Sequence, residues 1–167
     1  MNLVVAVDPS WGIGKDNDLL YHIPEDMKLF RQLTIGNFVI CGRKTLLSFP
    51  DSKPLPNRKH FVLTSGEICE SEDLAVVHNL QELDVAISQL DDERVFVIGG
   101  ETVYRQLYKK CKKAYVTKIF CNDKKADVFF PNLDEDTDFK LVEEGEVQES
   151  KNGKRFSFLV YENTAII

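Results

Sequence analysis

The chain has 167 residues, of which 43% are hydrophobic and 29% are charged, as is usual for a globular protein with a single domain. The net charge of -6 argues against a nucleic-acid partner, which would need a basic face. No apolar run approaches the roughly 20 residues that span a bilayer, and the start MNLVVAVDPS lacks the basic region of a signal peptide. We therefore expect a cytoplasmic protein without a membrane partner.

The N-terminal part is predicted to hold a strand, a long connection and a helix. Residues 3–7, LVVAV, form a buried strand. Residues 8–23 follow as a loop, although strand-to-helix connections usually have about 2–6 residues. A long structured loop at a strand end is typical of a lid over a ligand, and a plain surface loop is the alternative. The stretch 21–34 contains a helix that begins at Pro24, since proline suits the first helical position.

Strands and helices then alternate as far as residue 119. Strands are predicted at residues 37–42, 60–65, 74–78, 94–100 and 114–119. Helices are predicted at residues 43–49, 80–90 and 101–110. This alternation is typical of a parallel sheet with helices packed on it.

The pattern changes after residue 125. Residues 139–147 and 155–163 form two strands, and Asn152-Gly153 between them is a strong β-hairpin signal. The sequence therefore predicts one α/β domain over residues 1–167. It has a mostly parallel central sheet of about eight strands, helices on both faces and a C-terminal antiparallel hairpin.

One carboxylate on the first helix lies on the wrong face. At about 100° per residue, Met27, Leu29, Phe30 and Leu33 form an apolar stripe, and Asp26 falls within it. A buried carboxylate needs partners, and burial raises its pKa. A ligand rich in N–H donors would supply those partners, and such an acid could favour protonation of the ligand. The alternative is an ordinary acid of the first turn, stabilised by the helix dipole.

Two strand-to-helix turns carry glycine. They are Gly42-Arg43-Lys44 and Gly99-Gly100, and both follow predicted strands of the sheet. Ligands bind at the carboxyl ends of such strands, where backbone N–H groups hold phosphate. Arg43 and Lys44 could pair with the 2′-phosphate of NADP, and Thr64-Ser65 could add hydroxyl donors. The alternative is that these turns simply need glycine, since the G-x-G-x-x-G spacing is absent.

Other polar residues give weaker signals. Arg58 could clamp a ligand carboxylate through two parallel hydrogen bonds, although a solvated surface arginine is the commoner role. The cysteines form no C-x-x-C pair, which indicates reduced thiols, and the histidines lack metal-ligand spacing. No metal is predicted; the residues considered were Cys41, Cys69, Cys111, Cys121, His22, His60 and His78.

Taken together, seven segments in order resemble the dihydrofolate reductase family over nearly the whole chain. They are GIGKDNDL (12–19), HIPEDMKLFRQLT (22–34), VICGRKTLLSF (39–49), PLPNRKHFVLT (54–64), VFVIGGETVY (95–104), AYVTKI (114–119) and DVFFP (127–131). The resemblance implies NADPH-dependent reduction of 7,8-dihydrofolate to 5,6,7,8-tetrahydrofolate, with a hydride added at pterin C6 and a proton at N5. It also implies a monomer and binding of antifolate inhibitors.

The resemblance assigns a substrate side to the site. Asp26 matches the active-site acid, which would bind the pterin N3 and 2-amino group and favour protonation at N5, and Thr117 would support its carboxylate. Arg58 would clamp the glutamate α-carboxylate, with Arg31 nearby. The remaining residues implied on this side are Val4 and Ile98 through backbone carbonyls, together with Val5, Met27, Phe30 and Leu55 around the rings.

The resemblance also assigns a cofactor side, and it implies a cis peptide bond within Gly99-Gly100. The residues implied are Ala6, Ile13, Gly14, Lys15, Asp16, Asn17, Asp18, Leu19, Gly42, Arg43, Lys44, Thr45, Thr64, Ser65, His78, Ile98, Gly99, Gly100, Glu101, Thr102, Val103 and Tyr104.

The lid departs from the family pattern. Leu20-Tyr21 stands where many members have Pro-Trp, whose indole N–H can hold a water near the pterin. We expect the Tyr21 hydroxyl to take over this catalytic role, and loss of the proline to loosen the lid. Two other interpretations remain: a pyrimidine reductase of riboflavin synthesis, and a non-catalytic NADP-binding paralogue. Asp26 and Arg58 together favour the folate enzyme.

Overall fold

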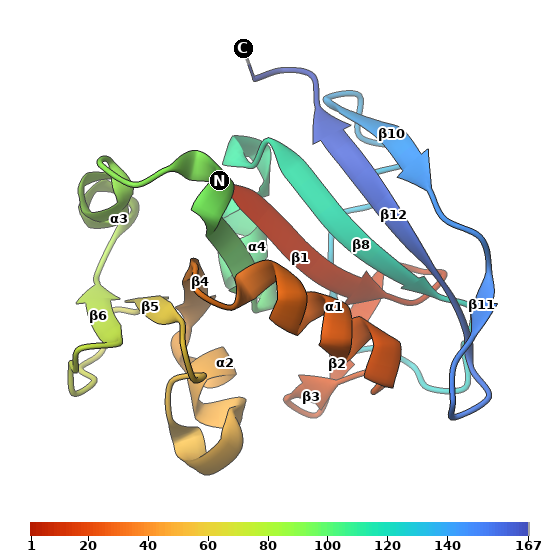
Figure 1. Ribbon diagram of the computed structural model, residues 1–167, viewed down its shortest axis with the longest axis horizontal. Helices are drawn as coiled ribbons and strands as arrows, with labels where there is room; N and C mark the ends of the chain where they lie inside the picture. The colour runs from red at the N-terminus through yellow and green to blue at the C-terminus, as the bar shows by residue number, and fades with distance from the viewer. Residues whose placement is uncertain (167) are drawn as a thin grey trace.

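The computed structural model describes residues 1–166, and its centre is one twisted sheet (Figure 1). Within these residues the sheet has nine strands, in the order β10-β12-β8-β1-β7-β4-β5-β6, with β11 paired to β12. The strands are β1 (Asn2–Val7), β4 (Phe38–Gly42), β5 (Lys59–Leu63), β6 (Leu74–Val77), β7 (Val95–Gly99), β8 (Lys113–Ile119), β10 (Phe139–Glu144), β11 (Gln148–Glu149) and β12 (Arg155–Asn163). The run from β8 to β6 is parallel, while β12 is antiparallel to β8 and to β10.

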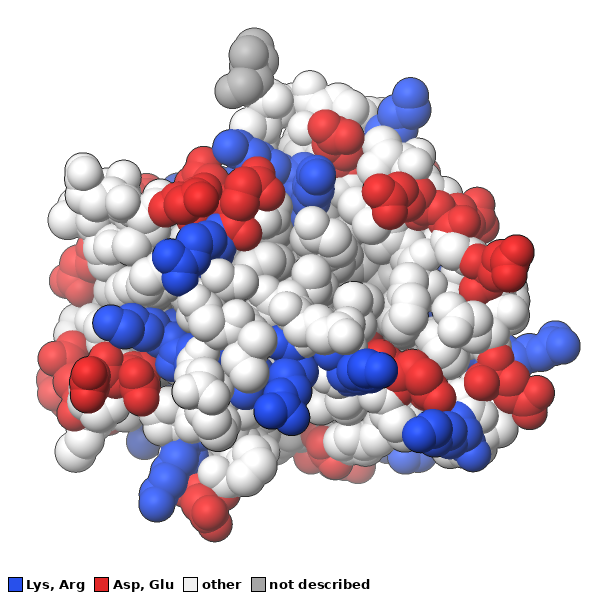
Figure 2. Space-filling view, in the orientation of Figure 1, with Lys and Arg blue, Asp and Glu red and all other residues white. Residues whose placement is uncertain are grey.

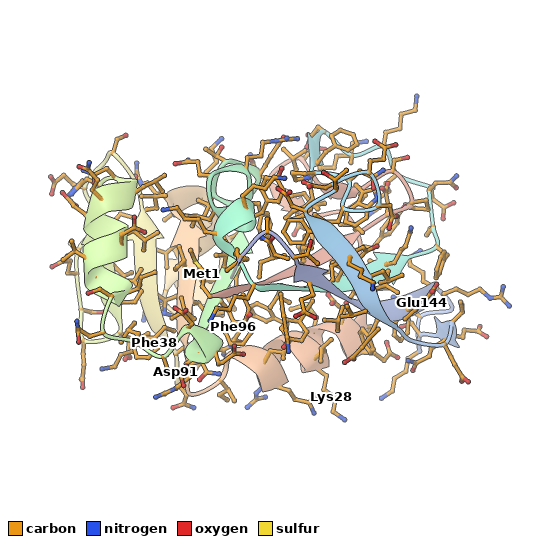
Figure 3. The ribbon with its side chains drawn as sticks, turned by 90° about the horizontal axis from the view of Figure 1, so that it is seen from above. Met1, Lys28, Phe38, Asp91, Phe96 and Glu144 are labelled. Atoms are coloured by element: carbon orange, nitrogen blue, oxygen red, sulfur yellow. The ribbon has the colours of Figure 1, made fainter. Side chains whose placement is uncertain are left out.

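Helices cover both faces of this sheet, as predicted. They are α1 (Pro24–Thr34), α2 (Arg43–Ser48), α3 (Leu80–Ile87) and α4 (Glu101–Leu107), with 3₁₀ turns at η1 (Pro50–Ser52), η2 (Asp92–Arg94) and η3 (Tyr108–Lys110). Successive side chains of a strand point to opposite faces. Val5 of β1 therefore packs in one cluster with Leu107 of α4, while Val4 packs in another with Leu46 of α2. Seen from above, α1 and α4 lie on opposite sides of the sheet, and Lys28 points outward from α1 (Figure 3).

The C-terminal hairpin forms at the predicted turn. Ser150 N–H donates to Lys154 O at 2.7 Å, and Gly153 has a φ of +84° that favours glycine. The predicted strand 139–147 is divided, however, because the Gly145 backbone comes close to β12. A Cβ at Gly145 would lie 2.9 Å from Phe158 O, to which Gly145 N–H donates at 2.8 Å, and the regular ladder with β12 resumes at Gln148 of β11.

The segment 8–23, predicted as a loop, contains a small sheet of its own. Its strands β2 (Gly12–Lys15) and β3 (Asp18–Leu19) pair with each other, and β2 also pairs with β9 (Val128–Phe129). The lid is therefore anchored to a segment more than a hundred residues further along the chain. Within residues 1–166, no helix is long and apolar enough to cross a bilayer.

The helices α3 and α4 end three residues before their predicted ends at 90 and 110. At both ends the chain tightens into i→i+3 hydrogen bonds, from Leu90 N to Ile87 O and from Cys111 N to Tyr108 O. Such tightening at a helix end carries little sequence signal.

Candidate active site

A cavity of about 730 Å³ opens where β1, β4 and β7 end. Its walls come from the lid, α1, α2 and the first turn of α4. This is the edge of the sheet at which the glycine turns were expected to meet. The cavity is therefore large enough, and placed correctly, for an extended ligand that contacts all these elements.

Asp26 is buried, as its place on the apolar stripe predicts. Only 7% of it is exposed, and its Oδ1 accepts a 2.6 Å hydrogen bond from the Thr117 hydroxyl of β8. Burial raises the pKa of Asp26, and the bond from Thr117 opposes that rise. Asp26 also lines the cavity, so a carboxylate with one protein partner faces the ligand space.

The apolar stripe of α1 forms a wall of the cavity as well as part of the core. Met27 is 43% exposed because it lines the cavity, where the resemblance places it, rather than packing on the sheet. Phe30 also lines the cavity while packing with Leu33 against the core. The helix therefore offers a carboxylate and two flat or flexible apolar side chains to the same space.

The two glycine turns lie against each other. Cys41 and Gly99 are partners in the β4–β7 ladder, and the Gly99-Gly100 peptide bond is cis, as the resemblance implies. A Cβ at Gly42 would lie 3.3 Å from Val103, and one at Gly100 would lie 3.4 Å from the Thr45 hydroxyl. Because glycine has no side chain, the two turns pack closely against their protein neighbours while both line the cavity.

Basic side chains lie beside these turns. Arg43 and Lys44 line the cavity, and Arg43 Nη1 is 3.7 Å from the position of a Cβ at Gly66. Arg43 therefore reaches the turn that follows β5, next to Thr64-Ser65. Two glycine turns and two cationic side chains therefore line the same cavity. This arrangement suits a ligand that carries several phosphates, so the residues present fit a phosphorylated dinucleotide.

Tyr104 fixes one of the expected backbone acceptors. Its buried hydroxyl donates to Val4 O at 2.6 Å, and burial raises its pKa far above the usual range. A carbonyl has two lone pairs, so Val4 O can still accept a second hydrogen bond from a ligand. Val4 and Ile98 both line the cavity.

Most of the predicted site residues surround this cavity. The predicted residues that line it are Val4, Val5, Ala6, Ile13, Gly14, Asn17, Asp18, Leu19, Asp26, Met27, Phe30, Gly42, Arg43, Lys44, Thr45, Leu55, Ile98, Gly99, Gly100, Glu101, Thr102, Val103 and Tyr104. Those outside its lining are Lys15, Asp16, Tyr21, Arg31, Arg58, Thr64, Ser65, His78 and Thr117. Thr117 lies behind Asp26, and His78 is tied to Glu82 by a 2.8 Å bond from its backbone N–H.

The expected role of Tyr21 does not agree with its position. Tyr21 is 4% exposed and packs in one apolar cluster with Ile23, Ile119 and Phe156. Its hydroxyl accepts a 2.9 Å bond from Lys124 N–H instead of facing the cavity. The direction of this side chain is set by the apolar cluster around it, which the order of residues in the lid does not reveal.

Leu20 also behaves differently from expectation. Its backbone N–H donates to Ile13 O at 3.3 Å, a hydrogen bond that proline at this position could not make. Asp16 N–H donates to Asp127 Oδ2 at 3.0 Å on the other side of the lid. These bonds hold the lid in place and oppose the loosening expected from the missing proline.

Several residues that line the cavity were not predicted. They are His22, Ser48, Phe49, Pro50, Leu63, Gln106, Asp127 and Val128. Six of them lie within segments that carry the family resemblance, so a signal was present for His22, Ser48, Phe49, Leu63, Asp127 and Val128. Pro50 and Gln106 lie outside those segments and gave none. Within residues 1–166 no group of three His, Cys, Asp or Glu side chains is placed to hold a metal ion.

The fold and the cavity define an α/β protein with a site suited to a phosphorylated dinucleotide beside a buried acid. The comparisons give the family: the family model described as dihydrofolate reductase matches residues 1–163, and the chain belongs to this family. The dihydrofolate reductase of Bacillus subtilis (strain 168) is 39% identical, over 97% of this chain and 94% of its own length. That of Staphylococcus haemolyticus is 32% identical, over 97% and 95%.

A solved structure agrees with these relatives. The dihydrofolate reductase from Enterococcus faecalis, complexed with NADP(H) and RAB-propyl, superposes with a TM-score of 0.82 at 31% identity. The match covers 97% of this chain and 95% of that chain. As a member of the family, the chain is an NADPH-dependent oxidoreductase that reduces 7,8-dihydrofolate to 5,6,7,8-tetrahydrofolate.

Proposed function

We propose that Asp26 is the residue around which this reduction is organised. The observation that carries the proposal is Asp26 itself, which is 7% exposed, lines the cavity and, among the described residues, has one protein hydrogen bond to its carboxylate. The bond from Thr117 fixes Oδ1, so the carboxylate is held in one orientation. Its free acceptor positions match the adjacent N3–H and 2-amino donors of a pterin, which form two parallel hydrogen bonds.

Asp26 also favours protonation of the bound substrate. A negative charge is poorly screened inside a cavity with apolar walls, so it stabilises positive charge that develops on the pterin when N5 gains a proton. NADPH, when bound, supplies the hydride that is added at C6. Met27 and Phe30 exclude water from one side of the ring and hold it in place for both additions.

The cofactor side is the part of the cavity that the glycine turns and α2 form. Gly99 and Gly100 present backbone amides, and Thr45 presents a hydroxyl close to both. Arg43 and Lys44 supply positive charge for the phosphates. Ala6 and the lid residue Ile13 line the inner end, where the nicotinamide must face the substrate.

The tail of the substrate meets Arg58. Arg58 is 8% exposed, and its guanidinium donates from Nε to Pro56 O at 3.0 Å and from Nη1 to Thr34 Oγ1 at 3.2 Å. These bonds orient it and leave Nη2 for a carboxylate. Burial, and then the neighbouring positive charge of Arg31, lower the pKa of Arg58, so an anion at this position would be strongly favoured. Figure 2 shows Lys and Arg side chains over α1 and beside α2, on this face.

The activity has a direct test. Purified protein is mixed with NADPH and dihydrofolate, and loss of the reduced-nicotinamide absorbance is followed. Turnover with dihydrofolate supports the proposal. NADPH binding without turnover would favour the non-catalytic paralogue, and turnover with a riboflavin-pathway pyrimidine in place of dihydrofolate would favour the pyrimidine reductase.

We further infer that the chain works as a single-domain monomer in the cytoplasm, without a nucleic-acid or membrane partner. The net charge of -6 supports the lack of a nucleic-acid partner, and the two sides of the cavity come from one chain. Antifolates that mimic the pterin ring would bind at Asp26. Sedimentation of the protein as a dimer at micromolar concentration would contradict the monomer.

A further inference from the structure

His60 of β5 is a buried imidazole behind the wall of the cavity. It is 1% exposed, and its ring meets Phe49 edge-on with the ring centroids 6.0 Å apart. Phe49 and Leu55 line the cavity, whereas His60 does not. His60 therefore contacts the wall from the outside and touches no ligand.

Two hydrogen bonds determine the protonation state of His60. Leu55 N–H donates to Nε2 at 3.1 Å, and Nδ1 lies 3.2 Å from Asp73 O. A carbonyl can only accept, so Nδ1 must carry a proton, and Nε2 must lack one to accept from Leu55. Both contacts are made only by this single neutral tautomer.

The bond from Leu55 holds one end of a tight chain reversal. At its other end, Asn57 has a φ of +59° and its carbonyl accepts from Gly36 N–H at 2.7 Å. Between them, Pro56 O accepts from Arg58 Nε at 3.0 Å, so the loop backbone orients the guanidinium. His60 thus controls the start of the segment 55–58 on which the position of Arg58 depends.

Burial favours the neutral form of His60. Burial is the main cause that lowers its pKa, and the positive charge of Arg58 acts in the same direction. The carbonyls of Asp73 and Arg58, and the negative charge of Asp73, oppose this without reversing it. Protonation therefore requires acid pH, below the usual 6.5 of histidine.

We propose that His60 is a positioning residue for the segment 55–58, which holds the substrate tail, and that protonation at Nε2 releases this segment. The proposal rests on the proposed role of Arg58 as the clamp for the tail. A proton on Nε2 replaces an acceptor with a donor, so Nε2 and Leu55 N–H then repel each other. Leu55 and Pro56 move, and the affinity falls for ligands that reach Arg58.

Two variants and two ligands test this. His60→Gln keeps an acceptor near the position of Nε2 but does not titrate, whereas His60→Leu keeps bulk and removes the acceptor. Binding is measured by fluorescence titration with dihydrofolate and with a dihydropterin that lacks the benzoylglutamate tail. At pH 7.5 we expect His60→Leu to weaken dihydrofolate binding about tenfold. Binding of NADPH and of the tail-less pterin should stay within about twofold, and His60→Gln should resemble the wild type.

The pH dependence separates positioning from a merely structural role. As the pH falls below 6.5, the ratio of dihydrofolate affinity in the wild type to that in His60→Gln should fall, because only the wild type gains a proton at residue 60. An unchanged ratio would overturn the proposal. So would equal weakening of dihydrofolate and of the tail-less pterin in His60→Leu.

The Leu55 amide provides a readout that needs no substrate. Its ¹H–¹⁵N resonance should shift with the titration of the His60 ring in the wild type and stay constant in His60→Gln. If the Leu55 resonance does not shift as His60 titrates in the wild type, the proposal is overturned, even if the variants unfold easily. Wild-type protein that binds NADPH but no dihydrofolate would instead overturn the proposed function, so the two failures are distinguishable.

Discussion

Glu25 and Asp26 are adjacent acids in the first turn of α1, but they lie in opposite environments. Glu25 accepts from the Ser150 hydroxyl at 2.7 Å and from Lys151 N–H at 3.0 Å, so it connects α1 to the C-terminal hairpin. Asp26 points about 100° away, into the cavity. The helix dipole accounts for Glu25 but does not require burial of Asp26. Retaining a desolvated charge at Asp26 therefore indicates a function in ligand binding.

Replacing this charge tests its role at the scale of one residue. We expect Asp26→Asn to lower turnover at pH 7 about a hundredfold or more, because the variant cannot stabilise a proton on N5. NADPH affinity should change less than about twofold, since the phosphates bind at the other end of the cavity. Stopped-flow hydride transfer and a fluorescence titration measure the two effects. Partial recovery at low pH is expected as the substrate arrives already protonated.

The stability of the same variant provides the control. The pKa of Asp26 is raised above 3.8, so the folded state binds its proton more tightly than the unfolded state does. Stability therefore falls as the pH rises through the raised pKa, because ionising the buried carboxylate costs more in the folded state than in the unfolded state. Asp26→Asn should be as stable as the wild type or more stable, by about 1 kcal/mol. A clearly lower free energy of unfolding for Asp26→Asn would mean that the variant loses turnover because it misfolds.

At the scale of the elements, the central sheet was predictable and the small lid sheet was not. The buried strand LVVAV and its parallel neighbours show as apolar runs because both faces are covered. By contrast, β3 and β9 have two residues each, and both pair with β2. The pairing of β2 with β9 is supported by contacts such as the hydrogen bond from Asp127 N–H to Gly14 O at 3.0 Å. No periodicity in a single segment can reveal a partner so distant in the chain.

The contact between Tyr21 and Lys124 joins the lid to the segment between β8 and β9. Tyr21→Phe removes the acceptor of Lys124 N–H, so we expect a loss of about 1 kcal/mol in the free energy of unfolding. Turnover should stay within about twofold, because the hydroxyl does not face the cavity. Chemical denaturation and steady-state kinetics measure both effects.

The opposite outcome for Tyr21 would restore its expected catalytic role. Unchanged stability with turnover lowered tenfold or more would mean that the hydroxyl reaches the ligand in the working enzyme. Amide hydrogen exchange at Lys124 gives an independent check, since exchange should quicken in Tyr21→Phe if the bond in the structure is present in solution.

For the whole molecule, the sequence predicted the acid and the glycine turns that form the site better than it predicted the long-range hydrogen bonds that position the other side chains. Asp26 followed from a helical period, and the turns at Gly42 and Gly99-Gly100 followed from where strands end. The support of Arg58 by His60 could not be predicted, because it depends on a chain reversal held by Gly36 and Leu55 backbone N–H groups. Local patterns predict elements, whereas long-range hydrogen bonds determine which side chains the elements present to the cavity.

The overall charge of -6 makes the basic groups at the cofactor end important for an anionic ligand. Arg43 is exposed and reaches the turn after Thr64-Ser65, where a 2′-phosphate would lie if it pairs with this guanidinium. NADPH carries that phosphate and NADH does not. Discrimination between the two should therefore depend on Arg43.

Ligand-linked stability measures this discrimination in the intact protein. A ligand at 100 times its Kd adds about 2.7 kcal/mol to the free energy of unfolding. Loss of hydrogen bonds between a charged group and the phosphate weakens binding by about 1.5–3 kcal/mol. At a fixed NADPH concentration of 100 times the wild-type Kd, we therefore expect Arg43→Gln to lower the stabilisation by about 1.4–2.4 kcal/mol. Stabilisation by NADH should not change, and Arg155→Gln, an exposed arginine on β12, should affect neither ligand. Equal losses for NADPH and NADH would place the 2′-phosphate elsewhere, because only contacts with that phosphate distinguish the two cofactors.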